Sequence, residues 1–209
     1  APPDTNASVG TSQIVQTVNV SFAVFDKSTG AVQQGPTPIK ALWKGFGGGC
    51  ENNNDGDPIV LFDKANQRWI FTQFSVSTKP YLQCFAVSTT SDALGSYNRF
   101  SYSFGNTSFP DYPKIGVWPS GYFMSFNIFW NGIFFLGPRA CAIDSKAAVA
   151  GNPPTMVCSS LSSSYGTLLP SDLDGSTPPP TGQPNFFVSM GTNQLRVWKF
   201  TPNFTTPSS

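Results

Sequence analysis

Glycine and proline interrupt this chain so often that long helices have little room to form between them. The 209 residues include 19 Gly and 19 Pro, and 14% of the residues are aromatic. This mixture favours short strands joined by tight turns over helices. The sequence therefore predicts an all-β fold, with strands grouped in small antiparallel sheets and two short helical inserts.

The stretch from Gly45 to Phe74 shows this pattern most clearly. Two apolar runs, Ile59 to Phe62 and Arg68 to Phe74, flank a polar turn, which is typical of a β-hairpin. Apolar runs of the same kind predict further strands at residues 13–25, 82–88, 97–104, 115–118, 122–127, 185–190 and 194–200.

The first of these strands shows a period of two along its whole length. This period predicts one buried face and one solvent-exposed face. The residues expected on the buried face are Ile14, Val18, Val20, Phe22 and Val24, and those expected on the solvent-exposed face are Thr17, Asn19 and Ser21.

Local signals place one hairpin and both helices. Asn131-Gly132 accepts the positive φ of a type I′ turn, so we expect a two-residue turn between the aromatic runs 128–130 and 133–135. An exposed apolar edge here would favour self-association. Helices are expected at residues 39–44 and at residues 145–150, the second between an Asp144 cap and a Gly151 stop.

The four cysteines fall into two pairs, neither with the spacing of a Cys-x-x-Cys metal motif. Of the three possible connectivities, the sequential one closes the shortest loops. We therefore predict disulfides between Cys50 and Cys84 and between Cys141 and Cys158. Four buried free thiols are the alternative.

The charge content points to an extracellular or cell-surface, secreted protein. Charged residues make up 11% of the chain, against roughly 25% in ordinary soluble domains. The net charge of +1 gives no electrostatic case for binding nucleic acid or an anionic membrane. The chain contains no run of about twenty apolar residues, so we do not expect it to insert into a membrane.

The chain contains no histidine. This excludes catalytic Ser-His and Cys-His pairs, imidazole zinc sites and histidine general bases.

Two loops are rich in oxygen ligands and predict Ca²⁺ as a candidate cofactor. Calcium prefers carboxylate and carbonyl oxygens, and a glycine in the loop permits the sharp turn that such a site needs. The first loop lacks the bidentate glutamate that completes a helix–loop–helix calcium site. Turns in which these side chains satisfy loop amides are the alternative. The candidate ligands are Glu51, Asn53, Asp55 and Asp57 in the first loop and Asp172 and Asp174 in the second.

Asp57-Pro58 and Asp111-Tyr112-Pro113 each precede a predicted strand, an arrangement similar to that of propeller glycoside hydrolases. Glycoside hydrolysis needs two carboxyl groups about 5 to 10 Å apart. Asp57 and Asp111 are therefore the candidate catalytic pair, and turn capping by each aspartate is the alternative.

Aromatic residues near turns could stack on a sugar ring, although most aromatics in such a fold are expected to pack in the core. The stacking candidates are Trp43, Tyr112, Trp118 and Trp130. Four Asn-x-Ser/Thr sequons predict glycosylation if the source is eukaryotic, at Asn6, Asn19, Asn106 and Asn203.

Long strings such as NVSFAVFDKSTGAV, FPDYPKIGVWPSGYFMSFNIF and NFFVSMGTNQLRVWKF resemble a family of uncharacterised secreted β-propeller proteins. The resemblance covers nearly the whole chain and implies a β-propeller fold and export, but no activity. The chain departs from the family pattern at Ser12-Gln13, where the family has Asn-His, and in the aromatic segment 126–135. Because the family is usually longer, residues 1–209 are expected to form one propeller domain or a fragment of a larger propeller.

These observations favour a non-enzymatic extracellular β-propeller module that binds a glycan or a protein partner, or that builds a surface assembly. A propeller-type glycoside hydrolase and a structural filament or matrix subunit are the alternatives.

Overall fold

The computed structural model describes residues 2–206. In this part of the chain the fold is all β, with four antiparallel sheets, two short α-helices and one 3-10 helix. The chain divides into two compact units, Ala1–Asn106 and Thr107–Ser209, called unit 1 and unit 2 here. The expectation of an all-β fold built from small antiparallel sheets is confirmed.

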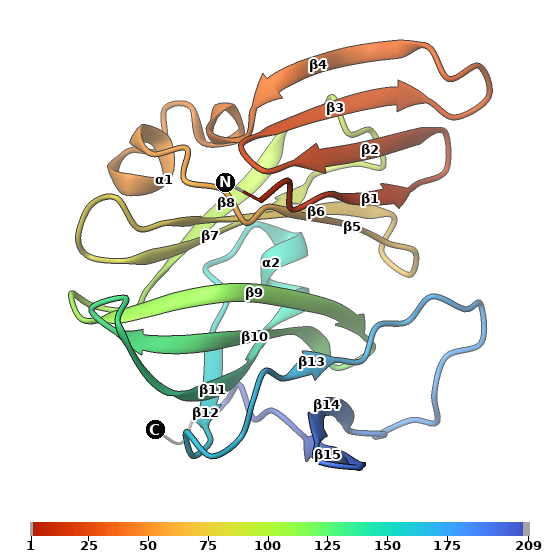
Figure 1. The fold of residues 1–209 in the computed structure, drawn as a ribbon. Coiled ribbons are helices and arrows are strands. Elements are labelled where there is room, and N and C mark those ends of the chain that lie inside the picture. Colours follow the sequence, from red (N-terminus) through yellow and green to blue (C-terminus); the bar gives the residue numbers. More distant parts are fainter. Residues whose placement is uncertain (1, 207–209) are drawn as a thin grey trace. The chain divides into compact units, whose positions relative to one another are not determined.

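Unit 1 contains two four-stranded sheets, in which each strand pairs with the strand that follows it in the chain (Figure 1). Sheet A consists of β1 (Asn6–Val9), β2 (Gln13–Val18), β3 (Ser21–Asp26) and β4 (Val32–Pro38). Sheet B consists of β5 (Ile59–Asp63), β6 (Arg68–Ser75), β7 (Leu82–Ser88) and β8 (Tyr97–Ser103).

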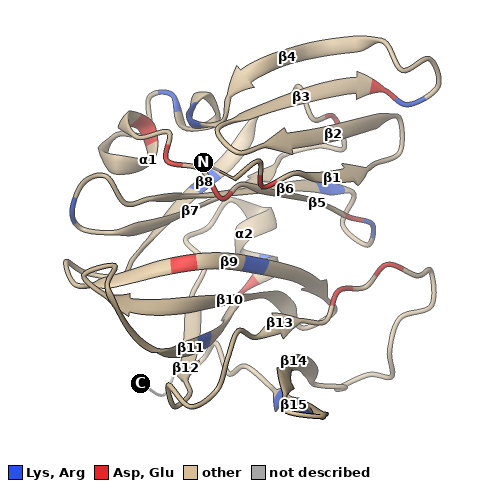
Figure 2. Cartoon of the chain, viewed as in Figure 1, with Lys and Arg blue, Asp and Glu red and all other residues tan. Residues whose placement is uncertain are grey.

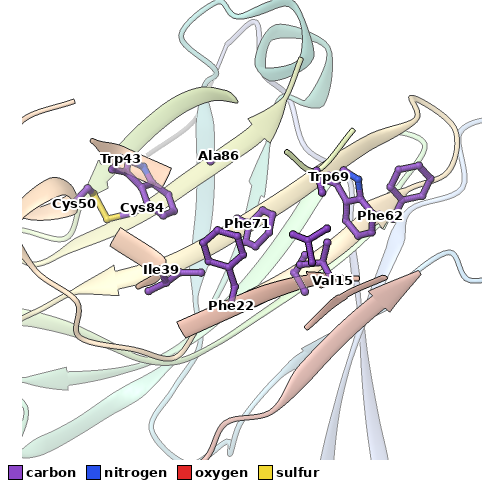
Figure 3. Packing of buried hydrophobic residues seen from close by; sticks show 13 residues of the cluster. Val15, Phe22, Ile39, Trp43, Cys50, Phe62, Trp69, Phe71, Cys84 and Ala86 are labelled. Atoms are coloured by element: carbon purple, nitrogen blue, oxygen red, sulfur yellow. A yellow bond between two sulfur atoms is a disulfide. The ribbon is translucent and has the colours of Figure 1, made fainter. Parts of the chain in front are cut away.

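Two short helices connect sheet A to sheet B. The 3-10 helix η1 (Ile39–Trp43) occupies most of the predicted helix 39–44, and α1 (Gly48–Asn52) follows a glycine turn. The sequence did not indicate α1. Both helices contribute to the core of unit 1 through Ile39, Trp43 and Cys50, which are buried against residues of both sheets (Figure 3).

The core of unit 1 is aromatic at its centre. The rings of Phe22 in sheet A and Phe71 in sheet B meet edge to face, with centroids 5.4 Å apart. Phe71 also meets Tyr97 at 5.7 Å. Edge-to-face pairs of this kind add about 0.5–1.5 kcal/mol beyond the burial of their area, so they help to hold the two sheets together.

The prediction of one strand over residues 13–25 is wrong, because a turn at Asn19 divides it. Asn19 has a φ of 44°, and the chain reverses there from β2 into β3. Neighbouring side chains in a strand point to opposite faces. Because the chain reverses, the buried residues are odd-numbered in β2 and even-numbered in β3. Thr17 is therefore buried and Val18 exposed, while Phe22 and Val24 are buried as expected.

A buried amide ties sheet A to the loop after β7. Gln13 Nε2 donates to Gln33 Oε1 at 2.9 Å and to Asp92 Oδ1 at 2.8 Å. The backbone amide of Ala93 donates to Gln13 Oε1 at 2.7 Å. One side chain thus satisfies polar groups from two separate segments of unit 1.

Unit 2 also contains two sheets (Figure 1). Sheet C consists of β9 (Ser108–Trp118), β10 (Gly121–Trp130), β11 (Phe134–Ile143) and β12 (Met156–Ser160). Sheet D has three strands, β13 (Leu169–Pro170), β14 (Asn185–Gly191) and β15 (Gln194–Phe200).

Helix α2 (Ser145–Ala150) lies between β11 and β12 and matches its prediction at both ends. Asp144 caps it by accepting from the amides of Lys146 and Ala147, at 3.0 and 3.2 Å. Gly151, with a φ of 79°, ends the helix in the left-handed conformation that glycine adopts without strain.

Sheets C and D share an apolar core. Phe123 of β10 meets Phe187 of β14 at a centroid distance of 6.2 Å and Phe200 of β15 at 5.9 Å. Leu168 and Val157 are buried in the same cluster. Unit 2 therefore has a core of its own.

The strand predicted at residues 115–118 is much longer than expected, because β9 begins at Ser108 and continues through Pro110 and Pro113. Tyr112 has a φ of 52°, and the pairing of β9 with β10 shifts between Ser125 and Asn127. A β-bulge of this kind absorbs an irregular residue without ending the strand. Asp111 and Tyr112 thus lie inside a strand, where a strand entrance was predicted.

The turn after β10 has the positive φ values predicted for Asn131 and Gly132, which are 49° and 74°. Trp130 pairs directly with Phe134, so the connection has three residues where two were expected. Ile133 and Phe134 are exposed, as the prediction of an apolar edge required.

Both predicted disulfides are confirmed. Cys50 of α1 is bonded to Cys84 of β7, and Cys141 of β11 is bonded to Cys158 of β12. The first joins the helical connection to sheet B within the core (Figure 3). The second links two residues that are direct partners in the ladder of sheet C.

We predict that Gln13→Ala lowers the free energy of unfolding by about 1–3 kcal/mol, because it leaves the buried amide of Ala93 without its acceptor. Urea unfolding followed by circular dichroism measures the change. Gln16→Ala is the matched control, since Gln16 lies exposed on the same strand. Equal effects of the two substitutions would contradict the role given to Gln13.

We also predict that the double substitution Cys50→Ala with Cys84→Ala lowers the unfolding free energy by about 2–4 kcal/mol, because the bond closes a loop in the unfolded chain. The same unfolding experiment tests it, with the substituted protein compared to the wild type under non-reducing conditions. An unchanged unfolding midpoint would contradict the stabilising role of this bond.

Candidate functional site

A cavity of about 380 Å³ opens in unit 2, where the bulged part of β9 lies close to β10, β13 and β14. We call it the Tyr112 pocket. Its volume lies within the range of about 300–1,000 Å³ that is usual for small-molecule sites. The lining side chains with polar or aromatic groups are Asp111, Tyr112, Asn127, Thr167 and Ser189.

The β9 bulge supplies the two most accessible groups of this pocket. Tyr112 is 44% exposed, and the ammonium of Lys114 lies 3.8 Å from the centre of its ring. Within the described residues, no hydrogen bond or ion pair engages the carboxylate of Asp111. The bulge therefore presents an aromatic ring and an available acceptor to the same cavity.

Asn127 of β10 adds a second acceptor. Its Nδ2 donates to Thr167 Oγ1 at 2.9 Å, which fixes the orientation of the amide. Its Oδ1 is buried and has no hydrogen-bond partner among the described residues. An unsatisfied buried carbonyl of this kind costs about 1–3 kcal/mol, and a ligand that donates a hydrogen bond to it would remove that cost.

The pocket combines a carboxylate, an amide oxygen, hydroxyl groups and a half-exposed aromatic ring. Apolar walls from Leu169, Val188 and Met190 complete it. This set of groups can accept hydrogen bonds from a ligand rich in hydroxyl groups and can pack against the apolar side of such a ligand.

A larger cavity of about 640 Å³ lies elsewhere in unit 2, beside Val157, Trp198 and Phe200. No carboxylate is among its described lining residues. Val157, Trp198 and Phe200 also belong to the apolar cluster shared by sheets C and D. We give more weight to the Tyr112 pocket, because polar groups converge on it.

Side chains of the first predicted calcium loop form hydrogen bonds with the preceding glycine turn and with the segment that follows β6. The carboxylate of Glu51 accepts from the amides of Gly45 and Gly47, at 2.8 and 2.7 Å. These amides stabilise the charged form and lower the pKa of Glu51 below its ordinary value. Asn53 Nδ2 donates to the hydroxyl groups of Ser75 and Thr78.

Asp55 plays a similar part in the same loop. Its Oδ2 accepts from the amides of Val76 and Ser77, at 2.6 and 2.7 Å. These amides belong to the segment that follows β6, so Asp55 ties its loop to that segment and does not form the local turn that was the alternative to a calcium site. Asp57 follows with a φ of 46° and is half-buried.

In the second predicted loop, Asp172 Oδ1 accepts from the amide of Val117 at 2.6 Å and so ties the loop to the end of β9. Asp174 is exposed. Within residues 2–206, no group of three His, Cys, Asp or Glu side chains is arranged to hold a metal ion. Calcium binding by either loop stays a prediction.

The two predicted catalytic aspartates belong to different units. Asp57 precedes β5 in unit 1, whereas Asp111 lies in β9 of unit 2. Asp111 lines the Tyr112 pocket, and the described lining residues of that pocket include no second carboxylate.

The aromatic stacking candidates separate into two groups. Trp43 is fully buried in the core of unit 1, so its prediction as a stacking residue is wrong. Trp118 is half-buried, and its indole Nε1 donates to the Gln183 carbonyl at 3.0 Å. Tyr112 and Trp130 remain accessible, at 44% and 46% exposure.

The sequons lie in different surroundings. Asn6 Oδ1 accepts from the amide of Val60 at 2.8 Å, and Asn203 Oδ1 accepts from the amides of Thr205 and Thr206. Asn19 lies in the turn between β2 and β3, and Asn106 is exposed between β8 and β9. Glycosylation at all four stays a prediction.

Sequence reasoning missed Asn127, Thr167 and Ser189 as pocket residues. They come from three segments that only the stacking of sheets C and D brings together. One signal was available for Asn127, since it is a polar residue within the apolar run Tyr122 to Trp130. Nothing in the local sequence distinguishes Thr167 or Ser189 from other surface hydroxyl residues.

Comparison of the chain with models of known protein families, with curated proteins and with solved structures found no match. The resemblance to secreted propeller proteins therefore stays a prediction. Among residues 2–206, no helix has the length and apolar character needed to cross a membrane.

We predict that Glu51→Gln weakens the dependence of stability on pH. Because the pKa of Glu51 is lower in the folded than in the unfolded chain, its stabilising contribution is present above the unfolded pKa of about 4.3 and disappears as the pH falls through the folded pKa. Unfolding curves recorded from neutral to acidic pH should therefore converge for wild type and variant at low pH. A constant difference at every pH would contradict this origin.

Proposed function

We propose that this chain is a non-enzymatic extracellular β-propeller module that binds a glycan in the Tyr112 pocket. The observation that carries the proposal is the convergence of the Asp111 carboxylate, the unpartnered Asn127 carbonyl and the half-exposed Tyr112 ring on one cavity. Sugars present hydroxyl groups that donate to such acceptors, and aliphatic ring faces that pack against aromatic side chains.

The propeller part of the proposal is supported by the sheets themselves. Three of the four sheets in residues 2–206 have four strands in chain order, which is the arrangement of a propeller blade. Sheet D has three strands in chain order. The extracellular part is supported by two disulfides, which persist in oxidising compartments, and by the low content of charged residues.

Binding without turnover fits the pocket better than hydrolysis. A glycoside hydrolase needs a second carboxyl group within about 10 Å of the first. Among the described residues, Asp111 alone supplies a carboxylate to the pocket lining. The proposal therefore gives Asp111 the role of a hydrogen-bond acceptor for the bound sugar.

We predict that Asp111→Asn and Tyr112→Asn each weaken saccharide binding by about 10-fold or more, since a hydrogen bond to a charged group contributes about 1.5–3 kcal/mol and the ring contributes packing. Asparagine is chosen at position 112 because it tolerates the positive φ there. A glycan array of neutral oligosaccharides identifies the probe, and calorimetry with that probe measures the affinities.

Trp130→Asn is the matched control, because Trp130 is as exposed as Tyr112 but lies outside the pocket lining. Repeating the titration with EDTA and with added Ca²⁺ tests the calcium hypothesis, and analysis of the sugar after incubation tests hydrolysis. Binding that survives both pocket substitutions, or that is lost with Trp130→Asn alone, would contradict the proposed site.

A further inference from the structure

Sheet D has one strand fewer than the other three sheets. In sheets A, B and C the third strand pairs with a fourth, and these pairs are β3 with β4, β7 with β8 and β11 with β12. In sheet D the third strand is β15, which pairs only with β14 among residues 2–206 (Figure 1). The other edge of β15 therefore has no strand beside it in the part of the chain that the structure describes.

The free edge of β15 presents backbone groups that can pair with another strand. Hydrogen-bonded and non-hydrogen-bonded residue pairs alternate along an antiparallel ladder, so every second residue of β15 directs its N–H and C=O away from β14. Natural edge strands are usually protected by proline, a bulge or short length. The opposite edge of the sheet, β13, has two residues, one of which is Pro170. In contrast, β15 has seven residues, contains no proline and pairs with β14 in unbroken register.

An apolar cavity adjoins this edge. It is the cavity of about 640 Å³ in unit 2, and its walls come from β15 and from β12, the outermost strand of sheet C. Trp198 and Phe200 of β15 are half-buried beside it, and Leu168 and Phe187 are buried in its lining. Paired residues of neighbouring strands place their side chains next to each other on the same face. A strand added to β15 would therefore direct every second side chain into this cavity.

The charge of sheet D determines what kind of strand fits. Its strands contain two basic residues, Arg196 and Lys199, and no acidic residue, and both basic residues lie in β15 (Figure 2). The guanidinium of Arg196 lies 5.2 Å from the centre of the Tyr165 ring. Lys199 is exposed, and within the described residues no hydrogen bond or ion pair engages its ammonium. Two copies of β15 would bring like charges together, which opposes their pairing, whereas an acidic side chain opposite Lys199 favours it.

We propose that the free edge of β15 binds an extended strand of a partner polypeptide, which becomes the fourth strand of sheet D. An extended polypeptide presents N–H and C=O groups at the spacing of this edge, and strand addition is a general mode of peptide recognition. The partner strand is apolar at the alternate positions that enter the cavity and acidic next to Lys199. The site is separate from the Tyr112 pocket, because the described lining of that pocket includes no residue of β12 or β15.

A synthetic peptide of alternating valine and glutamate, with capped ends and the seven-residue length of β15, is the probe. Amide NMR titration of the labelled whole chain should show saturable binding, with the largest shift changes on β15 and on the indole of Trp198. A control peptide has the same composition, but its valines and glutamates form two blocks. It should not bind, because it cannot place its apolar side chains on one face.

Backbone methylation of the probe separates strand pairing from apolar contact alone. Successive N–H groups of an extended peptide point to opposite edges. One peptide is therefore methylated on every valine nitrogen, and another on every glutamate nitrogen. Because only one set of N–H groups faces β15, one of these peptides should bind at least about 10-fold more weakly than the other.

A charge reversal on the chain tests the choice of an acidic partner. Lys199→Glu should weaken binding of the valine–glutamate peptide by about 5-fold and strengthen binding of a valine–lysine peptide, because the sign of the cross-strand charge pair is reversed. Lys146→Glu is the matched control, since Lys146 is exposed in α2 and does not line the cavity. It should leave the affinity for both peptides unchanged.

A substitution that fills the cavity tests the second contact. Ser159→Trp should weaken binding by at least about 10-fold, because Ser159 is exposed on β12 and a large side chain there occupies the space that the peptide needs. Ser163→Trp is the control, since Ser163 is exposed but lies outside the cavity lining. Circular dichroism shows whether each variant retains its strands.

Four results of the titrations would overturn the proposal. These are no saturable binding of the alternating peptide, equal binding of the block peptide, equal binding of the two methylated peptides, and shift changes centred on another strand edge such as β8. Analytical ultracentrifugation of the wild-type chain tests the remaining occupant. Dimers that the alternating peptide dissociates would also overturn the proposal, because a second copy would then occupy the edge of β15.

Discussion

Antiparallel pairing between strands that follow each other in the chain is the constraint on which this structure depends. Each sheet is formed by one contiguous segment of the chain, and within residues 2–206 no strand pairs with a strand of another sheet. A sheet made this way must still bury its apolar faces against another layer. Side chains distant in the sequence therefore meet in two places, where sheets stack and where the ladder of a sheet is interrupted.

The Tyr112 pocket forms where both conditions hold. The bulge at Tyr112 interrupts the ladder of sheet C, and the stacking of sheet D brings Ser189 to the same place. Proline contributes to the interruption, because Pro113 cannot donate a ladder hydrogen bond. A few residues of β9 therefore determine the bulge that places Asp111 and Tyr112 in the lining of the cavity.

The sequence predicts the hairpins well where two apolar runs flank a polar turn, as in β5 with β6 and in β14 with β15. It fails where the polarity of a strand is ambiguous. Residues 32–38 contain two glutamines, a glycine and two prolines, so β4 gives no apolar alternation to detect. The turn at Asn19 escaped notice because the apolar period continues through it, although the residues on the buried face change. The pocket itself was not predicted, and of its lining residues only Asp111 and Tyr112 were functional candidates from the sequence, since the other members are placed by packing between sheets.

The most direct test of the central claim is amide NMR mapping of the bound saccharide on the labelled chain. The proposed site predicts that the largest shift changes fall on Asp111, Tyr112, Asn127 and Ser189, which belong to three different strands. Shift changes confined to unit 1, or centred on Trp130 and Phe134 in the β10–β11 turn, would contradict it.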